Sequence, residues 1–468
     1  MSGHAALDPT YVESSLLTRE VVRVGVTRRA ETSRGGQIVP GPGGRRHEAP
    51  RGADQSRNAT ATCLAAAILV ALLLSITPAA ANSDFRAFVE LLWPDAQAAR
   101  VSRPTFDRAF RNVAPDLTIP DLILPGRDAS SGSGQAEFTR APQDYVAREQ
   151  LARLAAQGRT LAAEHSRTLD EVERQLRVDR HAVLAIWGRE TAFGTYKPSH
   201  YAVRVLATLA WTGRRKDLFR GELIYALRLL EDGVLTPETM RSSWAGAMGL
   251  TQFMPSEFYG SGHDLDGNGK IDLFGSIPDA LGSAAKQLQQ KGWVFGLPWG
   301  FEVALGPKVD CAEGGPVNAR PIAAWAQSGV TRVDGQPFPP QHLAQLAYLM
   351  SPGGTLGPQF LVTQNFIVIR AYNTADLYAL FVGHLEDRIA GGGDFRTPWS
   401  KIKQLSPRDI ETIQGRLQTA GFAIDKVDGK IGSNTRWQIG LYQRRHGLAV
   451  DCWPTERLLA HVRPSARQ

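Results

Sequence analysis

Cysteine is scarce in this sequence, which has 3 cysteines among 468 residues. Cys63 precedes the longest apolar run instead of following it, so its position does not fit a lipid-attachment cysteine. Cys311 and Cys452 remain, and an exported protein could join them in a disulfide. Nothing in the sequence shows that the two lie close together, so a disulfide and two unpaired thiols are equally open.

Long hydrophobic runs are also scarce. The run from Leu64 to Ile76 is nearly continuous, yet it is shorter than the roughly 20 apolar residues that a membrane-spanning helix needs. Ala79 and Ala81 follow it in an A-x-A arrangement, which is typical of the cleavage site of a secretory signal peptide. The sequence therefore predicts a signal peptide near residues 58–81, with cleavage after about Ala81, and hence an exported protein.

Hydrophobic periodicity is missing from residues 1–60, which are rich in Arg, Gly, Ser and Pro. This composition predicts disorder. A signal peptide so far from Met1 has two explanations: translation starts downstream of Met1, or the segment is a cytoplasmic tail on an uncleaved membrane anchor. We favour the first, because A-x-A-like sites mark segments that are removed. Proximity to the inner or outer membrane stays open.

A block of basic residues is absent as well. The formal net charge is +7, but Lys and Arg do not form the clusters that bind nucleic acid, so we expect no nucleic-acid partner. The mildly basic balance fits an anionic polymer only weakly. With 43% hydrophobic residues the chain can bury a full core, and its length predicts two or three domains.

The sequence does contain one helical pattern after another, separated by short loops, which predicts a mainly α fold. A glycine run at 391–393 indicates a linker, and the pattern after it is that of a small three-helix module. The principal helical stretches are 84–110, 145–163, 169–176, 203–209, 218–231, 280–290 and 365–385. The domains predicted are an N-terminal extension with signal peptide at 1–81, a large domain at 82–390, a linker at 391–404 and a small domain at 405–462.

Glu190 is the first candidate functional residue. Val183, Ile186 and Trp187 form an apolar helical face, and Glu190 falls on that same face. A carboxylate on a buried face is costly unless it is paired, protonated or functional. Burial would raise its pKa and suit it to general acid catalysis. The alternative is a structural ion pair between Glu190 and a buried arginine.

The segment from Ser243 to Pro255 is the second candidate. Its small residues allow close backbone approach, Gln252 offers an amide, and Trp244 and Phe253 offer ring faces. Amides together with apolar ring faces are the groups that bind sugars. A tightly packed helix start explains the small residues equally well.

A possible calcium loop follows. The side chains of four residues match the first, third, fifth and ninth positions of an EF-hand loop, with Gly269 at its turn. The twelfth position, where a bidentate acid belongs, is Gly275, and Asp279 lies too far along the chain to replace it simply. An Asp/Asn/Gly turn with side-chain caps is the alternative. The four candidate metal ligands are Asp264, Asp266, Asn268 and Asp272.

Two family resemblances emerge at this point. Residues from about 135 to 385 resemble the catalytic domain of lytic murein transglycosylases of the B type, and residues 405–459 resemble the common peptidoglycan-binding module. The first resemblance rests on Ala-Ile-Trp-Gly-Arg-Glu-Thr-Ala-Phe-Gly, Leu-Ala-Thr-Leu-Ala, Ser-Trp-Ala-Gly-Ala-Met-Gly-x-x-Gln-Phe-Met-Pro and Asn-Phe-x-x-Ile-x-x-Tyr-Asn. The second rests on Leu-Gln-x-x-Gly-Phe, Val-Asp-Gly-x-Ile-Gly-x-x-Thr and Tyr-Gln-x-x-x-Gly-Leu.

The resemblance implies a lysozyme-like α-rich catalytic domain with Glu190 as its single catalytic acid. It further implies that Ser243 and Gln252 act in the active site and that the metal loop holds a structural calcium ion, with no cofactor required. Gln287 stands where the family often has Tyr, so one sugar-stacking contact is in doubt. The residues expected to line the glycan cleft are Tyr145, Arg214, Arg215, Tyr372, Asn373 and Tyr378.

The implied reaction is non-hydrolytic cleavage of the bond between N-acetylmuramic acid and N-acetylglucosamine in peptidoglycan glycan strands, giving 1,6-anhydro ends. It would be carried out by a periplasmic monomer. Most glycosidases use two carboxylates, but we find no second acid at a matching helical spacing on the face of Glu190. A hydrolytic muramidase and a non-catalytic wall-binding protein are the alternatives.

Overall fold

The structure of the protein is a computed structural model that describes residues 78–124 and 136–463. By its contacts the chain divides into two units, and every described residue from Ala87 onward belongs to one of them. The predicted disorder of residues 1–60 and nearly all of the predicted signal peptide at 58–81 lie outside the described residues, which begin at helix α3 (Pro78–Glu90). Within the described ranges, no helix is both long and apolar enough to cross a membrane.

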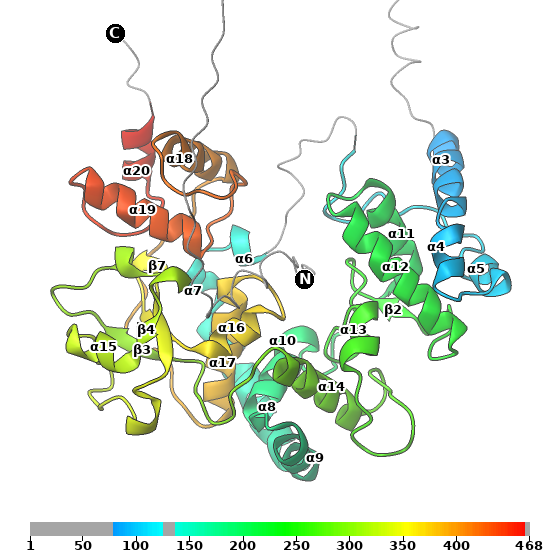
Figure 1. Ribbon diagram of the computed structural model, residues 1–468, viewed down its shortest axis with the longest axis horizontal. Coiled ribbons are helices and arrows are strands. Elements are labelled where there is room, and N and C mark those ends of the chain that lie inside the picture. Colours follow the sequence, from blue (N-terminus) through cyan, green and yellow to red (C-terminus); the bar gives the residue numbers. More distant parts are fainter. Residues whose placement is uncertain (1–77, 125–135, 464–468) are drawn as a thin grey trace, which may run out of the picture. The chain divides into compact units, whose positions relative to one another are not determined.

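Helices dominate, so the prediction of a mainly α fold is confirmed. The central group consists of helices that pack on one another around a core rich in Leu, Val and aromatic side chains (Figure 1). This group comprises α6 (Ala136–Thr139), α7 (Pro142–Tyr145), α8 (Arg148–Glu164), α9 (Ser166–Glu171) with a π-helical turn (Val172–Leu176), α10 (Arg180–Thr191), α14 (Ile277–Gln290), α16 (Gln364–Arg370) and α17 (Asp376–Ile389).

Helix α10 lies deep in this group. All six residues from Ala182 to Trp187 are buried, and α10 packs against α8, α14 and α17. Asp179 stands at its N-cap, but the Asp179 carboxylate accepts hydrogen bonds from Trp293 Nε1 (2.8 Å) and Gly296 N instead of capping the helix. The helix ends with Ala192 in the left-handed conformation.

A second helical group is built on α11 (Ala202–Thr212) and α12 (Lys216–Glu231), which pack along each other. Both were predicted from their apolar stripes, and their buried faces include Leu206, Leu209 and Leu223. Shorter helices pack on α12. They are α4 (Trp93–Ala98), α5 (Arg103–Ala109) and α13 (Pro255–Ser261).

An antiparallel sheet lies between α14 and α16 in the sequence, where the helical patterns did not predict it. Its strand order is β4-β6-β8-β3-β5, and it covers a separate core that contains Trp325 of α15 (Ile322–Gln327). Every residue of β8 is buried, and each strand is at most five residues long. Without alternation of apolar and polar residues, such strands leave no period-two signal. The strands are β3 (Gly300–Ala304), β4 (Arg320–Pro321), β5 (Thr331–Arg332), β6 (Leu346–Met350) and β8 (Gln359–Val362), with β7 (Pro352–Thr355) beside β8.

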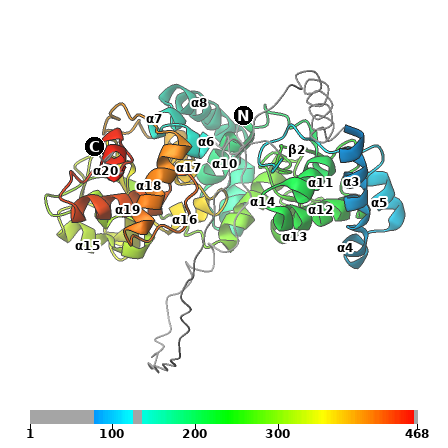
Figure 2. The same cartoon turned by 90° about the horizontal axis from the view of Figure 1, so that it is seen from above.

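The C-terminal module contains the three expected helices, α18 (Pro407–Thr419), α19 (Ser433–Arg445) and α20 (Glu456–Val462), which Figure 2 shows close together. Its core includes Ile410, Ile413, Leu417 and Ile439 from the predicted stripes. The residues before it, predicted as a linker, pack against neighbouring elements: the Phe395 ring stacks on His384 with 3.7 Å between ring centres.

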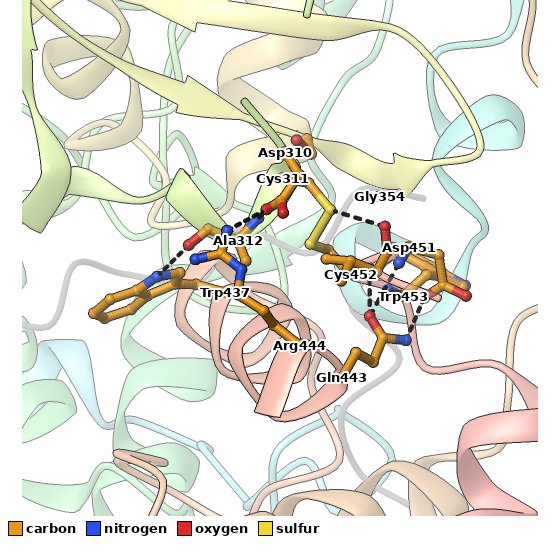
Figure 3. Close-up of a disulfide and its surroundings, with 12 residues drawn as sticks. Asp310, Cys311, Ala312, Gly354, Trp437, Gln443, Arg444, Asp451, Cys452 and Trp453 are labelled. Atoms are coloured by element: carbon orange, nitrogen blue, oxygen red, sulfur yellow. Dashed lines mark hydrogen bonds and ion pairs between the residues drawn. A yellow bond between two sulfur atoms is a disulfide. The ribbon is translucent and has the colours of Figure 1, made fainter. Parts of the chain in front are cut away.

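The structure joins Cys311 and Cys452 in a disulfide, with their Cα atoms 6.1 Å apart (Figure 3). The bond spans 141 positions of sequence and links the module to the segment between β3 and β4. Backbones also approach closely here, because Thr355 N donates to Asp451 O (2.9 Å). A Cβ on Gly354 would lie 2.0 Å from that same oxygen, so glycine is required.

Candidate active site

Glu190 lies in the last turn of α10 with its side chain buried at 2% exposure, as its place on the apolar stripe predicted. The hydroxyl of Tyr378, from α17, donates a hydrogen bond to Glu190 Oε1. Burial and the adjacent Glu190 raise the pKa of Tyr378 well above its usual value. The tyrosine therefore stays protonated and acts as a permanent donor to the acid.

Tyr372 connects this pair to the segment 243–255. Its ring stacks on that of Tyr378, with 6.5 Å between ring centres and 8° between planes. Its hydroxyl donates to Thr251 O (2.6 Å), and its ring lies edge-on to Phe253. Segments that are far apart in the sequence are thus joined around Glu190, and they include both tyrosines predicted from 365–385.

The segment from Ser243 to Met254 forms turns, and helix α13 begins only at Pro255. Ser243 Oγ accepts a hydrogen bond from Ala247 N (3.2 Å), while Gln252 Nε2 donates to Gly249 O (2.9 Å). A Cβ on Gly249 would lie 2.6 Å from Leu273 O, so a small residue is needed here. Gln252 itself has a positive φ of 55°, and its Oε1 is buried without a hydrogen-bond partner among the described residues.

Tyr145, expected in the glycan cleft, is buried in a polar cluster that the sequence did not reveal. Its hydroxyl receives a hydrogen bond from Arg189 and donates to Glu137 Oε1 (3.1 Å). The Arg189 guanidinium also lies 5.0 Å from the centre of the Phe381 ring. Arg189 is off the apolar stripe of α10, so the helical period gave no sign that α17 covers it.

The other predicted cleft residues lie at two places. Arg214 and Arg215 precede α12 and both pair with Asp121, at 3.5 Å from Nε and 3.0 Å from Nη2 respectively. They therefore lie beside α11 and α12 and not on α10, the helix that carries Glu190. Asn373 is buried between α16 and α17, where its Oδ1 accepts from Ala375 N (3.3 Å).

A second partly buried acid was not singled out from the sequence. Glu257 of α13 accepts hydrogen bonds from Met254 N (2.9 Å) and from the side-chain amide of Gln287. Burial raises the pKa of Glu257 to about 7. The pKa of Tyr372 is raised by burial, by Glu190 and then by Glu257, so Glu257 acts electrostatically on this tyrosine.

The predicted calcium loop lies close to a carboxylate that was not among its predicted ligands. Oxygens of Asp264, Asp266 and Asp279 lie within 4.8 Å of one another, so Asp279 does reach the loop although sequence spacing argued against it. The Asp279 carboxylate accepts from the backbone N–H groups of residues 265, 266 and 272, which folds it under the loop.

Asn268 and Asp272 cap turns within the loop, as Asp264 and Asp266 also do. Asn268 Oδ1 accepts from Lys270 N (2.9 Å), and Asp272 Oδ1 accepts from Phe274 N (2.8 Å) and Gly275 N (2.9 Å). Among the carboxylates, those of Asp264, Asp266 and Asp279 lie close enough together to hold a cation.

Comparison with known families agrees with this architecture. Residues 84–387 match the transglycosylase SLT domain family, and residues 406–461 match the peptidoglycan binding domain family. The chain therefore belongs to the lytic transglycosylases, an enzyme class, and it carries a peptidoglycan-binding module at its C-terminal end.

Individual relatives extend this assignment. Membrane-bound lytic murein transglycosylase B of Escherichia coli (strain K12) is 29% identical over 222 residues, which cover 44% of this chain and 56% of that protein. The chain thus spans little more than half the length of this curated relative. The crystal structure of SltB3 from Pseudomonas aeruginosa in complex with NAG-NAM-pentapeptide is 38% identical, with a TM-score of 0.74, covering 81% of this chain and 99% of that one.

Proposed function

We propose that this protein cleaves the bond between N-acetylmuramic acid and N-acetylglucosamine in peptidoglycan without water, producing 1,6-anhydro ends, with Glu190 as its single acid and base. The observation that carries this proposal is the geometry at Glu190: a buried carboxyl on a rigid helix, oriented by a hydroxyl donor that does not itself ionise near neutral pH. The substrate class follows from the family and from the C-terminal module.

One side chain is enough to carry out both proton transfers of the proposed reaction. Glu190 donates a proton to the glycosidic oxygen as the bond to C1 of the muramic acid residue breaks, and the neighbouring acetamido carbonyl assists departure. The Glu190 carboxylate then removes the proton from the C6 hydroxyl, whose oxygen closes onto C1. Intramolecular attack has the advantage of effective concentration over water.

Gln252 and Ser243 would orient the acetamido group. Gln252 Nε2 is already engaged with Gly249 O, so the amide is fixed, and its Oε1 is buried with no hydrogen-bond partner among the described residues. A buried acceptor without a partner is costly, and substrate binding would remove that cost.

A hydrolytic mechanism would need a second carboxylate to activate water. Among the described acids that act on residues beside Glu190, Glu137 and Glu257 both already accept hydrogen bonds. Glu137 is bound by Tyr145 and Arg189, and Glu257 by Met254 N and Gln287. This supports the anhydro product over the muramidase alternative. SltB3 has also been solved in complex with NAG-anhNAM-pentapeptide, at 37% identity to this chain and a TM-score of 0.73.

The test is digestion of purified murein followed by product mass analysis. We expect products lighter by one water than hydrolytic ones and resistant to borohydride reduction. Glu190→Gln should abolish lysis, because the amide keeps the shape but cannot donate the proton, whereas Glu164→Gln, the same change at an exposed position of α8, should not. Reducible, hydrated ends would favour a muramidase, and the absence of lysis by the unaltered protein would favour a wall-binding role.

We further propose that the loop around Asp264 holds a structural calcium ion. Asp264, Asp266 and Asp279 would supply carboxylate oxygens, which are the ligands that calcium prefers. Gly275 at the twelfth position cannot supply the usual bidentate carboxylate, so the affinity should lie toward the weak end of the EF-hand range. The ion would neutralise three converging charges and has no step in the reaction.

The cellular setting is proposed from the sequence. The apolar run and A-x-A site near residues 58–81 support export to the periplasm as a monomer, with peptidoglycan glycan strands as the partner. N-terminal sequencing of the mature protein from a periplasmic extract would test the cleavage after about Ala81.

A further inference from the structure

The C-terminal module is fixed in one orientation on the rest of its unit. The disulfide between Cys311 and Cys452 joins the two covalently, and Trp437 Nε1 of α19 donates to Ala312 O (3.0 Å) beside it (Figure 3). The cavity left at this interface measures about 20 Å³, which is room for about one water molecule. A module that only tethered the enzyme to its polymer would not need this close fit.

A buried ionic cluster lies at the same interface. Asp376, the first residue of α17, pairs with Arg370 Nε at 2.9 Å and with Arg436 Nη2 of the module at 2.5 Å. The Ser433 hydroxyl of the module donates to the same carboxylate. The side chains of Arg436 and Asp376 are only 6% and 3% exposed. Burial alone would raise the pKa of Asp376, but the two arginines outweigh it and lower that pKa to about 2.

The position of this cluster in the chain links it to the active site. Arg370 ends α16 and Asp376 begins α17, so their ion pair closes the connection that carries Tyr372 and Asn373. Tyr378, the hydrogen-bond donor to Glu190, lies two residues beyond Asp376 in the first turn of α17. The module therefore holds, through one carboxylate, the start of the helix that orients the catalytic acid.

We propose that Arg436 of the peptidoglycan-binding module is a positioning residue of the active site, which acts through Asp376 to fix the first turn of α17 and with it Tyr378. The inference rests on the proposed catalytic role of Glu190. It assigns the module a part in the chemical step that is separate from polymer binding, because the contact is buried inside the protein and not on a face that a glycan could reach.

The positioning role of Arg436 can be tested separately from the attachment of the module. Removing Arg436 leaves the disulfide and the Trp437 contact in place, so the module stays attached. What changes is the environment of Asp376, which loses one of two buried counter-charges. A buried charge without its partner either drives local rearrangement or draws in water, and both would loosen the turn that carries Tyr378.

The experiment compares full-length variants on short soluble glycan fragments and on intact sacculi. Arg436→Met removes the charge and retains most of the side-chain volume. We expect kcat on the soluble fragments to fall by about tenfold to a hundredfold, the range in which small misplacements of catalytic groups act. KM on these fragments and pelleting with sacculi should change less than about twofold, and Arg436→Lys should recover part of kcat.

The matched control is Arg444→Met, which removes an exposed pair with Asp310 (2.6 Å) at the edge of the same interface and should leave kcat unchanged. Equal kcat in Arg436→Met and the unaltered protein would overturn the proposal, as would a loss confined to sacculus binding. If Arg436→Met does not fold, Ser433→Ala removes the neutral contact to the same carboxylate and should lower kcat to a smaller extent. An inactive unaltered protein would instead refute the proposed function.

Discussion

Replacing Tyr378 by Phe tests whether this tyrosine orients Glu190, the proposed catalytic acid. The substitution removes one hydroxyl and keeps the ring that stacks on Tyr372. The hydroxyl is the donor to Glu190 Oε1 in a buried site, and hydrogen bonds to charged groups are worth about 1.5–3 kcal/mol. If the hydrogen bond stabilises the transition state by this amount, its loss should lower kcat by about tenfold to a hundredfold.

The measurement is steady-state kinetics on soluble glycan fragments, with thermal unfolding recorded in parallel. KM should change little, because the lost contact orients the acid and does not bind substrate. Tyr259→Phe is the control, since it removes a hydroxyl bonded to the exposed Asp232 (2.6 Å). A kcat for Tyr378→Phe within about twofold of the unaltered protein would refute the idea that this tyrosine orients Glu190.

Two further predictions concern Glu257 and the calcium loop. The pKa of Glu257 is raised to about 7 in the folded protein, against about 4.3 in an unfolded chain, so the folded state binds more protons in that window and stability falls as pH rises from about 4 to about 7. Glu257→Gln should flatten this fall in urea titrations, and an unchanged slope would contradict it. Millimolar calcium should raise the melting temperature, and Asp279→Asn should abolish that rise. If calorimetry detects no heat of calcium binding to the unaltered protein, the loop is a turn that binds no metal.

The parts of this fold that were predictable are those with a local signal. The helices through Val183, Leu206 and Ile413 were predictable because their apolar residues recur with the helical period. Glu190 was singled out by the same rule, since it interrupts an apolar face. The sheet was missed because its strands are short and β8 is buried throughout, which removes the alternation that marks a half-buried strand.

The calcium loop shows how spacing can mislead. Asp279 was set aside because it lies beyond the twelfth position of the loop, yet α14 begins at Ile277 and its first turn brings that carboxylate back under the loop. Asp272, at a favourable spacing, instead caps the turn that leads into α14. The outcome depends on where the next helix starts, which the ligand pattern does not encode.

The pairing of Cys311 with Cys452 also depends on contacts between residues that are far apart in the sequence. The sequence left it open, because two cysteines separated by 141 positions carry no mark of proximity. Its consequence is equally invisible in the sequence: once the module is docked, Arg436 enters a buried cluster with Asp376. Arg436 lies in an ordinary helical stretch, and nothing in its local pattern distinguishes it from the exposed Arg444 two turns later.

These cases share one physical cause. A buried carboxylate must be compensated by donors or counter-charges, but the compensating groups can come from any segment that the fold brings near. Glu190 is compensated by Tyr378, Glu137 by Tyr145 and Arg189, and Asp376 by Arg370 and Arg436. Local patterns can therefore show that an acid is buried and needs a partner, whereas the identity of the partner is decided by tertiary packing. In this protein the partners of Glu190 and Asp376 come from that second level, and one of them, Arg436, belongs to the C-terminal module.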